Sequence, residues 1–253
     1  MKKGLTSNDL KIIAIITMLI DHIGYYLYSY LSFEIYVAFR IIGRISMPIF
    51  AFLIVQGFLH TKNIKKYISR ILGLALITQI CFYILHYINI TNFPYYRNEV
   101  YRILNILFSY GLSLILLYIL SQKKIIQKYN EIINIFIKLI IIILILIAYL
   151  NLEFDYGLRI PFIMIGLFFI EKLCPKDTWA SKLKYLSLIL VVFLLSLIKV
   201  ENGIICKYAM LLSLIFIAFY NGEKGNNNKF VKYSFYAFFP IHHTILYLIG
   251  MFS

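Results

Sequence analysis

Two adjacent ionisable residues, Asp21 and His22, lie within an apolar stretch near the start of the chain. An imidazole exchanges a proton near neutral pH, so His22 can act as a general base, and a carboxylate nearby can stabilise the imidazolium that results. Successive residues of a helix point about 100° apart, so Asp21 either supports His22 indirectly or pairs with an arginine of the next segment. A purely structural alternative, in which the two residues only hold helices together, also stays open.

Two arginines, Arg40 and Arg44, are spaced so that one helical face carries both guanidinium groups. Such a pair suits an anion, for example the phosphates of a cofactor or a carboxylate. Lys11 shares a helical face with His22, which places a basic side chain at the start of the same helix. The alternative for the arginines is that Arg40 extends to the membrane interface while Arg44 neutralises Asp21.

Two polar turns interrupt the later apolar segments. Each pairs a short polar motif with a basic residue: Asp155-Tyr156-Gly157 with Arg159, and Tyr220-Asn221-Gly222 with Lys224. Both motifs have ordinary structural explanations, since the first is a common loop pattern and the second is typical of a helix C-terminus. Taken by themselves, they do not define a site.

A pair of histidines, His242 and His243, follows Pro240 in the last apolar segment. We expect one of them to face the protein interior. Because no third ligand stands at metal-ligand spacing from them, the sequence predicts no zinc site. The three cysteines are far apart and are expected to be packing residues rather than a redox or metal motif.

The segments that carry these residues are those of a membrane protein. Of the 253 residues, 62% are hydrophobic and 14% are charged, a balance that belongs in lipid. The apolar runs approach the roughly 20 residues that cross a bilayer as a helix, and they lack the alternation of barrel strands. We therefore expect an all-α polytopic transmembrane bundle that forms one domain over residues 1–253.

Hydrophobic stretches separated by basic loops predict about nine spans. They lie near residues 11–29, 36–58, 71–88, 103–120, 132–150, 159–172, 184–199, 204–220 and 233–250. The sixth is short and contains Pro161, so a tilted or partly re-entrant segment is the alternative there.

The formal net charge of +14 would suit a nucleic-acid partner, but the basic residues lie in short loops between apolar segments. They read as topology signals and predict a cytoplasmic N-terminus, with no role in binding nucleic acid. The loops expected in the cytoplasm are residues 1–11, 60–70, 121–131, 172–184 and 221–232. No small-residue cleavage site follows the first apolar run, so we expect no removable signal peptide.

Five ordered blocks of sequence resemble the TraX family of bacterial conjugal-transfer membrane proteins, named for the enzyme that acetylates the N-terminus of F-type pilin. The blocks are residues 10–24, residues 40–52 with Gly57, residues 155–157, residues 220–225 and residues 235–242. The resemblance covers essentially the whole chain. It departs from the commoner pattern at Ser46-Met47 and at the doubled histidine of positions 242 and 243.

The resemblance implies a multi-pass acetyltransferase of the bacterial cytoplasmic membrane. Acetyl-CoA would be the co-substrate, and the acceptor would be an amine or hydroxyl of a peptide N-terminus or an envelope component at or beyond the outer face. His22 would then deprotonate the acceptor, with Asp21 tuning it. The residues implied to bind the cofactor are Arg40, Arg44, Lys11, Tyr220, Asn221 and Lys224. Those implied to support the substrate are Asp155, Tyr156, Arg159 and His242.

The sequence leaves other functions open. The same intramembrane charges suit a transporter or channel for a small anion or solute. A structural component of a conjugation or secretion assembly is a further alternative. Association with a second copy of the chain is compatible with each of these functions.

Overall fold

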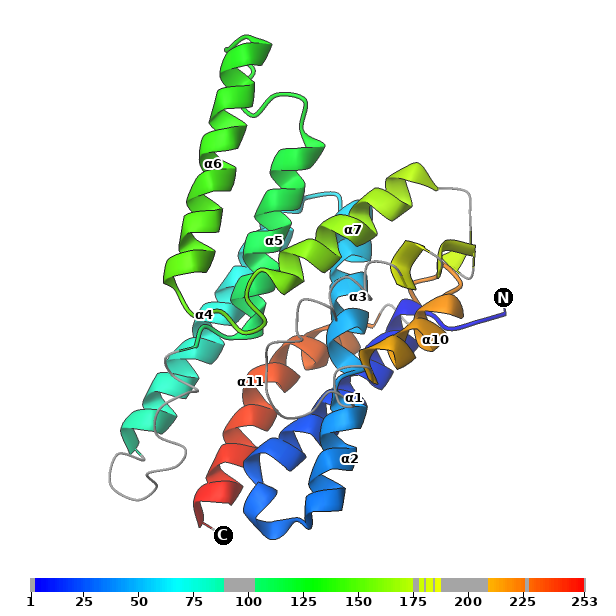
Figure 1. The fold of residues 1–253 in the computed structure, drawn as a ribbon, viewed down its shortest axis with the longest axis vertical. Coiled ribbons are helices and arrows are strands. Elements are labelled where there is room, and N and C mark those ends of the chain that lie inside the picture. Colours follow the sequence, from blue (N-terminus) through cyan, green and yellow to red (C-terminus); the bar gives the residue numbers. More distant parts are fainter. Residues whose placement is uncertain are drawn as a thin grey trace. The chain divides into compact units, whose positions relative to one another are not determined.

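The fold is known from a computed structural model that describes residues 3–88, 103–174, 178–179, 181–183, 185–187, 209–225 and 228–252. These residues form helices and two isolated β-bridges, which confirms the all-α class (Figure 1). The chain divides into two compact units, one of Met1–Gln56 with Gly166–Ser253 and one of Gly57–Ile165.

The first unit is built around α1 (Ser7–Tyr26), which packs against α2 (Phe33–Gly43) and α11 (Lys229–Phe252). It also holds η1 (Tyr28–Tyr30), most of α3 (Ser46–His60), the end of α7 (Arg159–Leu173), η2 (Ala209–Leu212) and α10 (Ser213–Ala218). Glycines permit the close approach of α1 and α2. A Cβ on Gly43 would lie 2.1 Å from Cβ of Asp21, and one on Gly24 would lie 3.0 Å from Cβ of Phe39.

The start of α1 is fixed by hydrogen bonds of two kinds. Thr6 and Asp9 form a capping box, in which each side chain accepts a hydrogen bond from the other residue's backbone N–H. The Thr6 hydroxyl and N–H also hold the pKa of the Asp9 carboxyl below its ordinary value. Upstream, Leu5 forms a parallel bridge with Tyr220, donating its N–H to Phe219 O and accepting from Asn221 N. The N-terminal segment is therefore tied to the loop that precedes α11.

The second unit contains α4 (Ile64–Ile88), α5 (Ile106–Ser121) and α6 (Glu131–Asn151), with α5 packed against both of the others. Buried polar side chains bind the ends of these helices. Asn105, which caps α5, donates to Ala75 O and to Gln79 Oε1, both at 2.9 Å. Asn134 in α6 accepts from the N–H groups of Ile125 and Ile126 at 2.8 Å and donates to three carbonyls of the same loop.

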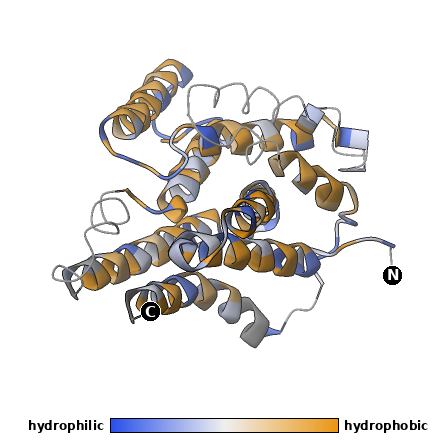
Figure 2. Ribbon diagram, turned by 60° about the horizontal axis from the view of Figure 1, so that its bottom comes forward, coloured by the Kyte–Doolittle hydropathy of each residue, from blue (hydrophilic) through white to orange (hydrophobic). Residues whose placement is uncertain are grey.

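Three of the described helical segments are long and apolar enough to cross a membrane: Phe33–His60, Ile64–Leu85 and Glu131–Asn151. Figure 2 shows hydrophobic residues along most of the long helices. The last of the three buries only 17% of its apolar window inside the protein, as a lipid-facing helix would. The helical membrane character predicted from the sequence is therefore supported, whereas the count of nine spans and the orientation of the N-terminus stay predictions.

Several predicted spans correspond to single helices, one contains a turn within the candidate span Phe33–His60, and two lie partly outside the described residues. The span predicted at 36–58 is divided into α2 and α3 by a turn at Arg44–Ile45. Pro48 explains the break, because it lacks a backbone N–H and is accommodated in the first turn of α3. The span predicted at 184–199 lies outside the described residues except for 185–187, and the one at 204–220 is described only from 209, as η2 and α10.

Candidate functional site

An ion-pair cluster joins α1 to α2 around the buried carboxylate of Asp21. Arg40 Nη1 lies 3.0 Å from Asp21 Oδ1, and Arg44 Nη2 donates to both carboxylate oxygens at 3.2 and 3.3 Å. Arg40 also stacks its guanidinium over the ring of Tyr25 at 5.6 Å. The sequence left open whether Asp21 supports His22 or pairs with an arginine of the next segment. The structure shows the second arrangement, with both arginines. With two cations and one anion, the cluster keeps a formal charge of +1.

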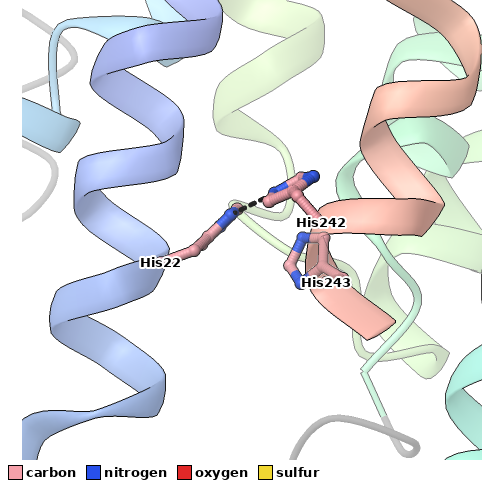
Figure 3. A group of neighbouring side chains, drawn as sticks. All are labelled: His22, His242 and His243. Carbon is pink, nitrogen blue, oxygen red and sulfur yellow. Dashed lines mark hydrogen bonds between the residues drawn. The ribbon is translucent and has the colours of Figure 1, made fainter. Parts of the chain in front are cut away.

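A chain of hydrogen bonds joins His22 on α1 to α11 (Figure 3). Nδ1 of His22 lies 2.7 Å from Nε2 of His242, and Nδ1 of His242 lies 2.6 Å from the carbonyl oxygen of Phe238. A carbonyl only accepts, so Nδ1 of His242 carries a hydrogen and its Nε2 is the acceptor. Nδ1 of His22 is then the donor, which leaves the lone pair of neutral His22 on Nε2. The fold thereby selects the tautomer of His22 in which Nε2 is basic.

His243 completes a cluster of three imidazoles. Its ring centroid lies 4.1 Å from that of His22 and 4.5 Å from that of His242. One ring nitrogen of each histidine lies within 4.8 Å of the others, and Nδ1 of His243 is 2.9 Å from the hydroxyl of Tyr26. The premise that no third ligand accompanies His242 and His243 was therefore wrong. The third imidazole comes from α1, 220 residues away in the sequence.

The remaining cofactor candidates gather near the start of α1. Nζ of Lys11 donates to Asn8 Oδ1 at 3.4 Å and lies 5.3 Å from the ring of Phe235 on α11. The hydroxyl of Tyr220 is 3.1 Å from Ser7 Oγ. Asn221 donates through its side chain to Gly4 O at 3.4 Å, and Lys224 is exposed nearby. Ser7 and His22 are fifteen residues apart on α1, which is about 22 Å along a helix axis. The structure thus separates these residues from the imidazoles.

Asp155, Tyr156 and Arg159 belong to the second unit. Asp155 donates its N–H to Leu104 O at 3.0 Å and accepts at its carbonyl from Ser109 Oγ at 3.0 Å. Tyr156 has a φ of 61°, a left-handed conformation that costs energy for a residue with a side chain. Arg159 begins α7. The hydrogen bonds of Asp155 thus shape a tight turn beside α5 in the second unit, whereas the three imidazoles belong to the first unit.

The local sequence explains how α11 presents its two adjacent histidines. The ring of Phe238 stacks on His242 with centroids 4.5 Å apart, and the Phe238 carbonyl oxygen accepts a hydrogen bond from Nδ1 of the same imidazole. Pro240 stands inside the helix and removes one backbone N–H there. Tyr26, Phe238 and His243 were all missed as site residues from the sequence. The only signal available for His243 was its position beside His242.

The two clusters give the first unit a definite chemical capacity. His22 provides a nitrogen base whose tautomer is set by His242. Asp21, the residue before His22, is occupied by Arg40 and Arg44, and this ion-pair cluster carries a net positive charge. Such an arrangement is suited to removing a proton from one substrate while the arginines bind a negative group. The negative group can belong to that substrate or to a second one.

Comparison with known proteins gives one family and one relative. The family model described as "TraX protein" matches residues 6–250. The chain is 28% identical over 254 residues to the "Probable fimbrial assembly protein FimC, serogroup H1" of Dichelobacter nodosus, a match that covers 96% of this chain and 95% of that protein. No solved structure matches the chain.

Proposed function

Since the chain belongs to the TraX family, we propose that it is a membrane-embedded acetyltransferase with a role in pilus assembly or conjugation. It moves an acetyl group from cytoplasmic acetyl-CoA to an amine or hydroxyl at or beyond the outer face of the membrane. The acceptor is a peptide N-terminus, such as that of a pilin, or an envelope component. The name of the fimbrial relative supports the pilus-related part of this proposal.

The observation that carries the enzymatic part is the hydrogen-bonded chain from His22 through His242 to the carbonyl of Phe238. A general base needs a free lone pair at a fixed position, and this chain leaves that lone pair on Nε2 of His22. When His22 gains a proton, its Nδ1–H becomes a charged donor to His242. Hydrogen bonds of charged groups contribute about 1.5–3 kcal/mol, so His242 stabilises the imidazolium more than the neutral ring.

The proposed reaction is an acyl transfer in which bonds and protons balance. Nε2 of His22 takes the proton of the acceptor N–H or O–H, and the acceptor atom attacks the thioester carbonyl of acetyl-CoA. The C–S bond then breaks, and the CoA thiolate leaves with the proton that the imidazolium returns. Asp21 does not accept this proton, because its carboxylate is held by Arg40 and Arg44.

The arginine cluster supports binding of the anionic substrate. Arg40 and Arg44 share one carboxylate, so the cluster retains a positive charge inside a largely apolar protein. This net positive charge would attract a phosphate of CoA or a carboxylate of the acceptor. In this proposal Asp21 holds the two guanidinium groups ready for that anion.

The residues near the start of α1 provide a second contact for the cofactor. Lys11, Tyr220, Asn221 and Lys224 gather around the N-terminal end of α1. Along the helix axis, His22 is about 22 Å from Ser7, the contact of Tyr220, and about 16 Å from Lys11. A cofactor that touches both places must be long and must carry its phosphates far from its reactive end. CoA fits this description, because its pantetheine arm separates the nucleotide from the thioester.

The proposal also includes the orientation of the chain. We propose a multi-pass protein of the bacterial cytoplasmic membrane with about nine spans and a cytoplasmic N-terminus. The basic loops support this orientation by the positive-inside rule. With the start of α1 in the cytoplasm, Lys11 and Lys224 lie on the side where acetyl-CoA is found, and His22 lies eleven residues farther along α1 than Lys11.

The proposal is tested with membranes that contain the full-length chain, labelled acetyl-CoA and a peptide with a free N-terminus or an envelope fraction as the acceptor. His22→Ala should reduce labelling of the acceptor by about 10²–10⁴-fold, the usual contribution of a general base. His60→Ala, which removes an exposed imidazole at the end of α3, is the matched control and should label normally. Undiminished labelling by His22→Ala would reject His22 as the base.

Binding of CoA gives a second readout that does not need the acceptor. A ligand at 100 times its dissociation constant stabilises the folded protein by about 2.7 kcal/mol. CoA should therefore raise the melting temperature of the purified chain, and Arg44→Gln should reduce that rise. A melting temperature indifferent to CoA would favour a structural component of a pilus or conjugation assembly instead.

A further inference from the structure

We propose that His22, His242 and His243 form a binding site for one divalent transition-metal ion of the zinc class. The proposal rests on the geometry of the three imidazoles and not on acetyl transfer. Imidazole nitrogen is a ligand for Zn²⁺, Ni²⁺, Cu²⁺ and Co²⁺, and three histidines with an open fourth position are the ligand set of a catalytic or exchangeable zinc site.

The ring nitrogens of the three histidines are spaced similarly to the ligands of a metal ion. A tetrahedral ion with metal–nitrogen bonds of about 2.0–2.1 Å holds its ligand nitrogens about 3.3 Å apart. Nδ1 of His22 and Nε2 of His242 lie 2.7 Å apart, and one ring nitrogen from each of the three histidines lies within 4.8 Å of the others. Binding of an ion would open the close pair slightly and would bring the third imidazole to the same spacing. Figure 3 shows His22 pointing from α1 toward the two histidines of α11.

Two of the three imidazoles already have the outer partners that a metal ligand needs. A ligand histidine generally donates its other ring N–H to a carbonyl, carboxylate or similar group, which fixes the tautomer and the ring. Nδ1 of His242 has the Phe238 carbonyl at 2.6 Å, and Nδ1 of His243 has the Tyr26 hydroxyl at 2.9 Å. With Nδ1–H donating to each partner, Nε2 would be the ligand atom of both His242 and His243.

Binding requires only that a proton moves within His22. In the hydrogen-bonded state its Nδ1 carries the hydrogen that points at His242. A metal ion would take the place of that hydrogen, and His22 would bind it through Nδ1 while carrying its own proton on Nε2. No proton is lost from the cluster, because the three imidazoles bind as neutral ligands.

The surrounding charges set the strength of the site. Arg40 and Arg44 oppose a cation, and Asp21 cancels only one of their two charges. The fourth position would be filled by water or another small ligand, since the carboxylate of Asp21 is held by the arginines. An anion bound as the fourth ligand would therefore strengthen the site, and halide or acetate in the buffer should raise the affinity.

A bound metal ion would affect the proposed acetyl transfer, and this consequence rests on the proposed function. A metal-bound His22 has its proton on Nε2, so it cannot act as the base. Zn²⁺ would therefore inhibit acetyl transfer, and chelation would restore it. Binding itself does not depend on whether the chain transfers acetyl groups.

The test is a Co²⁺ titration of the full-length chain, purified in detergent without a polyhistidine tag and freed of metal with EDTA. We expect one Co²⁺ per chain with the visible d–d absorption of a tetrahedral site, and displacement by an equimolar amount of Zn²⁺. His243→Asn and His242→Asn should each weaken binding at least about 10-fold, and Tyr26→Phe should weaken it by about 10–100-fold as an outer partner. His60→Ala should bind like the unsubstituted chain.

The titration separates metal binding from catalysis and from misfolding. Each variant is checked by gel filtration and circular dichroism, and the unsubstituted chain is melted with and without Zn²⁺, since a bound ion raises the melting temperature. Absence of the tetrahedral band from the unsubstituted chain, or a band that survives His242→Asn and His243→Asn together, would overturn the proposal. Neither outcome bears on the acetylation assay, so failure of one proposal leaves the other open to its own test.

Discussion

The contact between Gly43 and Asp21 should be among the most sensitive points of the first unit. A Cβ at Gly43 would lie 2.1 Å from Cβ of Asp21 and 2.3 Å from its Cγ and Oδ1. An ordinary carbon–carbon contact is about 3.5–4.0 Å, so Gly43→Ala must move α2 away from α1 by more than about 1 Å. Overpacking of this kind costs about 1–3 kcal/mol. The same movement stretches the ion pairs of Asp21, and breaking a buried pair costs about 3–5 kcal/mol.

This expectation is measured by thermal unfolding of the full-length chain in detergent. A loss of about 2–3 kcal/mol lowers the melting temperature of a chain of this size by about 5–10 °C. Gly73→Ala in α4 is the control, because a Cβ there meets no atom within 4 Å and alanine is the better helix former by about 0.5–1 kcal/mol. A melting temperature for Gly43→Ala equal to that of the unsubstituted chain would refute the argument that α1 and α2 meet at this glycine.

Two further predictions concern buried polar groups. Asn134→Leu leaves the N–H groups of Ile125 and Ile126 without their acceptor, so the free energy of unfolding should fall by about 2–4 kcal/mol, measured by thermal or denaturant unfolding. An unchanged stability would contradict the role of Asn134 in holding that loop. Lys182→Met should destabilise the chain by more than the double change with Glu171→Leu, because the single change leaves a carboxylate that had its cation at 2.6 Å without it. Equal losses of stability in the single and double variants would contradict the expectation that the unpaired carboxylate of Glu171 is costly.

The helices that carry the site could be predicted from the sequence. Runs of apolar residues near the length of a bilayer crossing gave the positions of α1, α4, α5, α6, α7 and α11 to within several residues. The pairing of Asp21 was also predictable as one of two alternatives, because a buried carboxylate requires a nearby cation and the following segment supplies two. The apolar run at 36–58 corresponds to the candidate span Phe33–His60, but its length alone did not place the turn at Arg44–Ile45 that precedes Pro48.

The histidine cluster could not be predicted, because its members are 220 residues apart and no local pattern connects them. Periodicity places a residue on one face of a helix, but it does not say which other helix that face meets. Lys182 shows that the surroundings of a charged residue are equally hard to predict from local sequence. The sequence assigned it to a basic cytoplasmic loop, whereas the structure buries it against Glu171 and 5.0 Å from the ring of Trp179. A charged residue in a predicted loop is expected to be exposed to solvent unless the residue that forms an ion pair with it is known.

The central claim is that His22 and His242 act as one hydrogen-bonded unit that removes the acceptor's proton. It is tested most directly by a double-mutant cycle on the rate of acetyl transfer, with His22→Ala, His242→Ala and both changes together. The account predicts a loss of at least about 100-fold in His22→Ala, a smaller loss in His242→Ala, and no further loss in the double variant, because residues that act as a unit are not additive. Losses that multiply in the double variant, or full activity in His22→Ala, would contradict it.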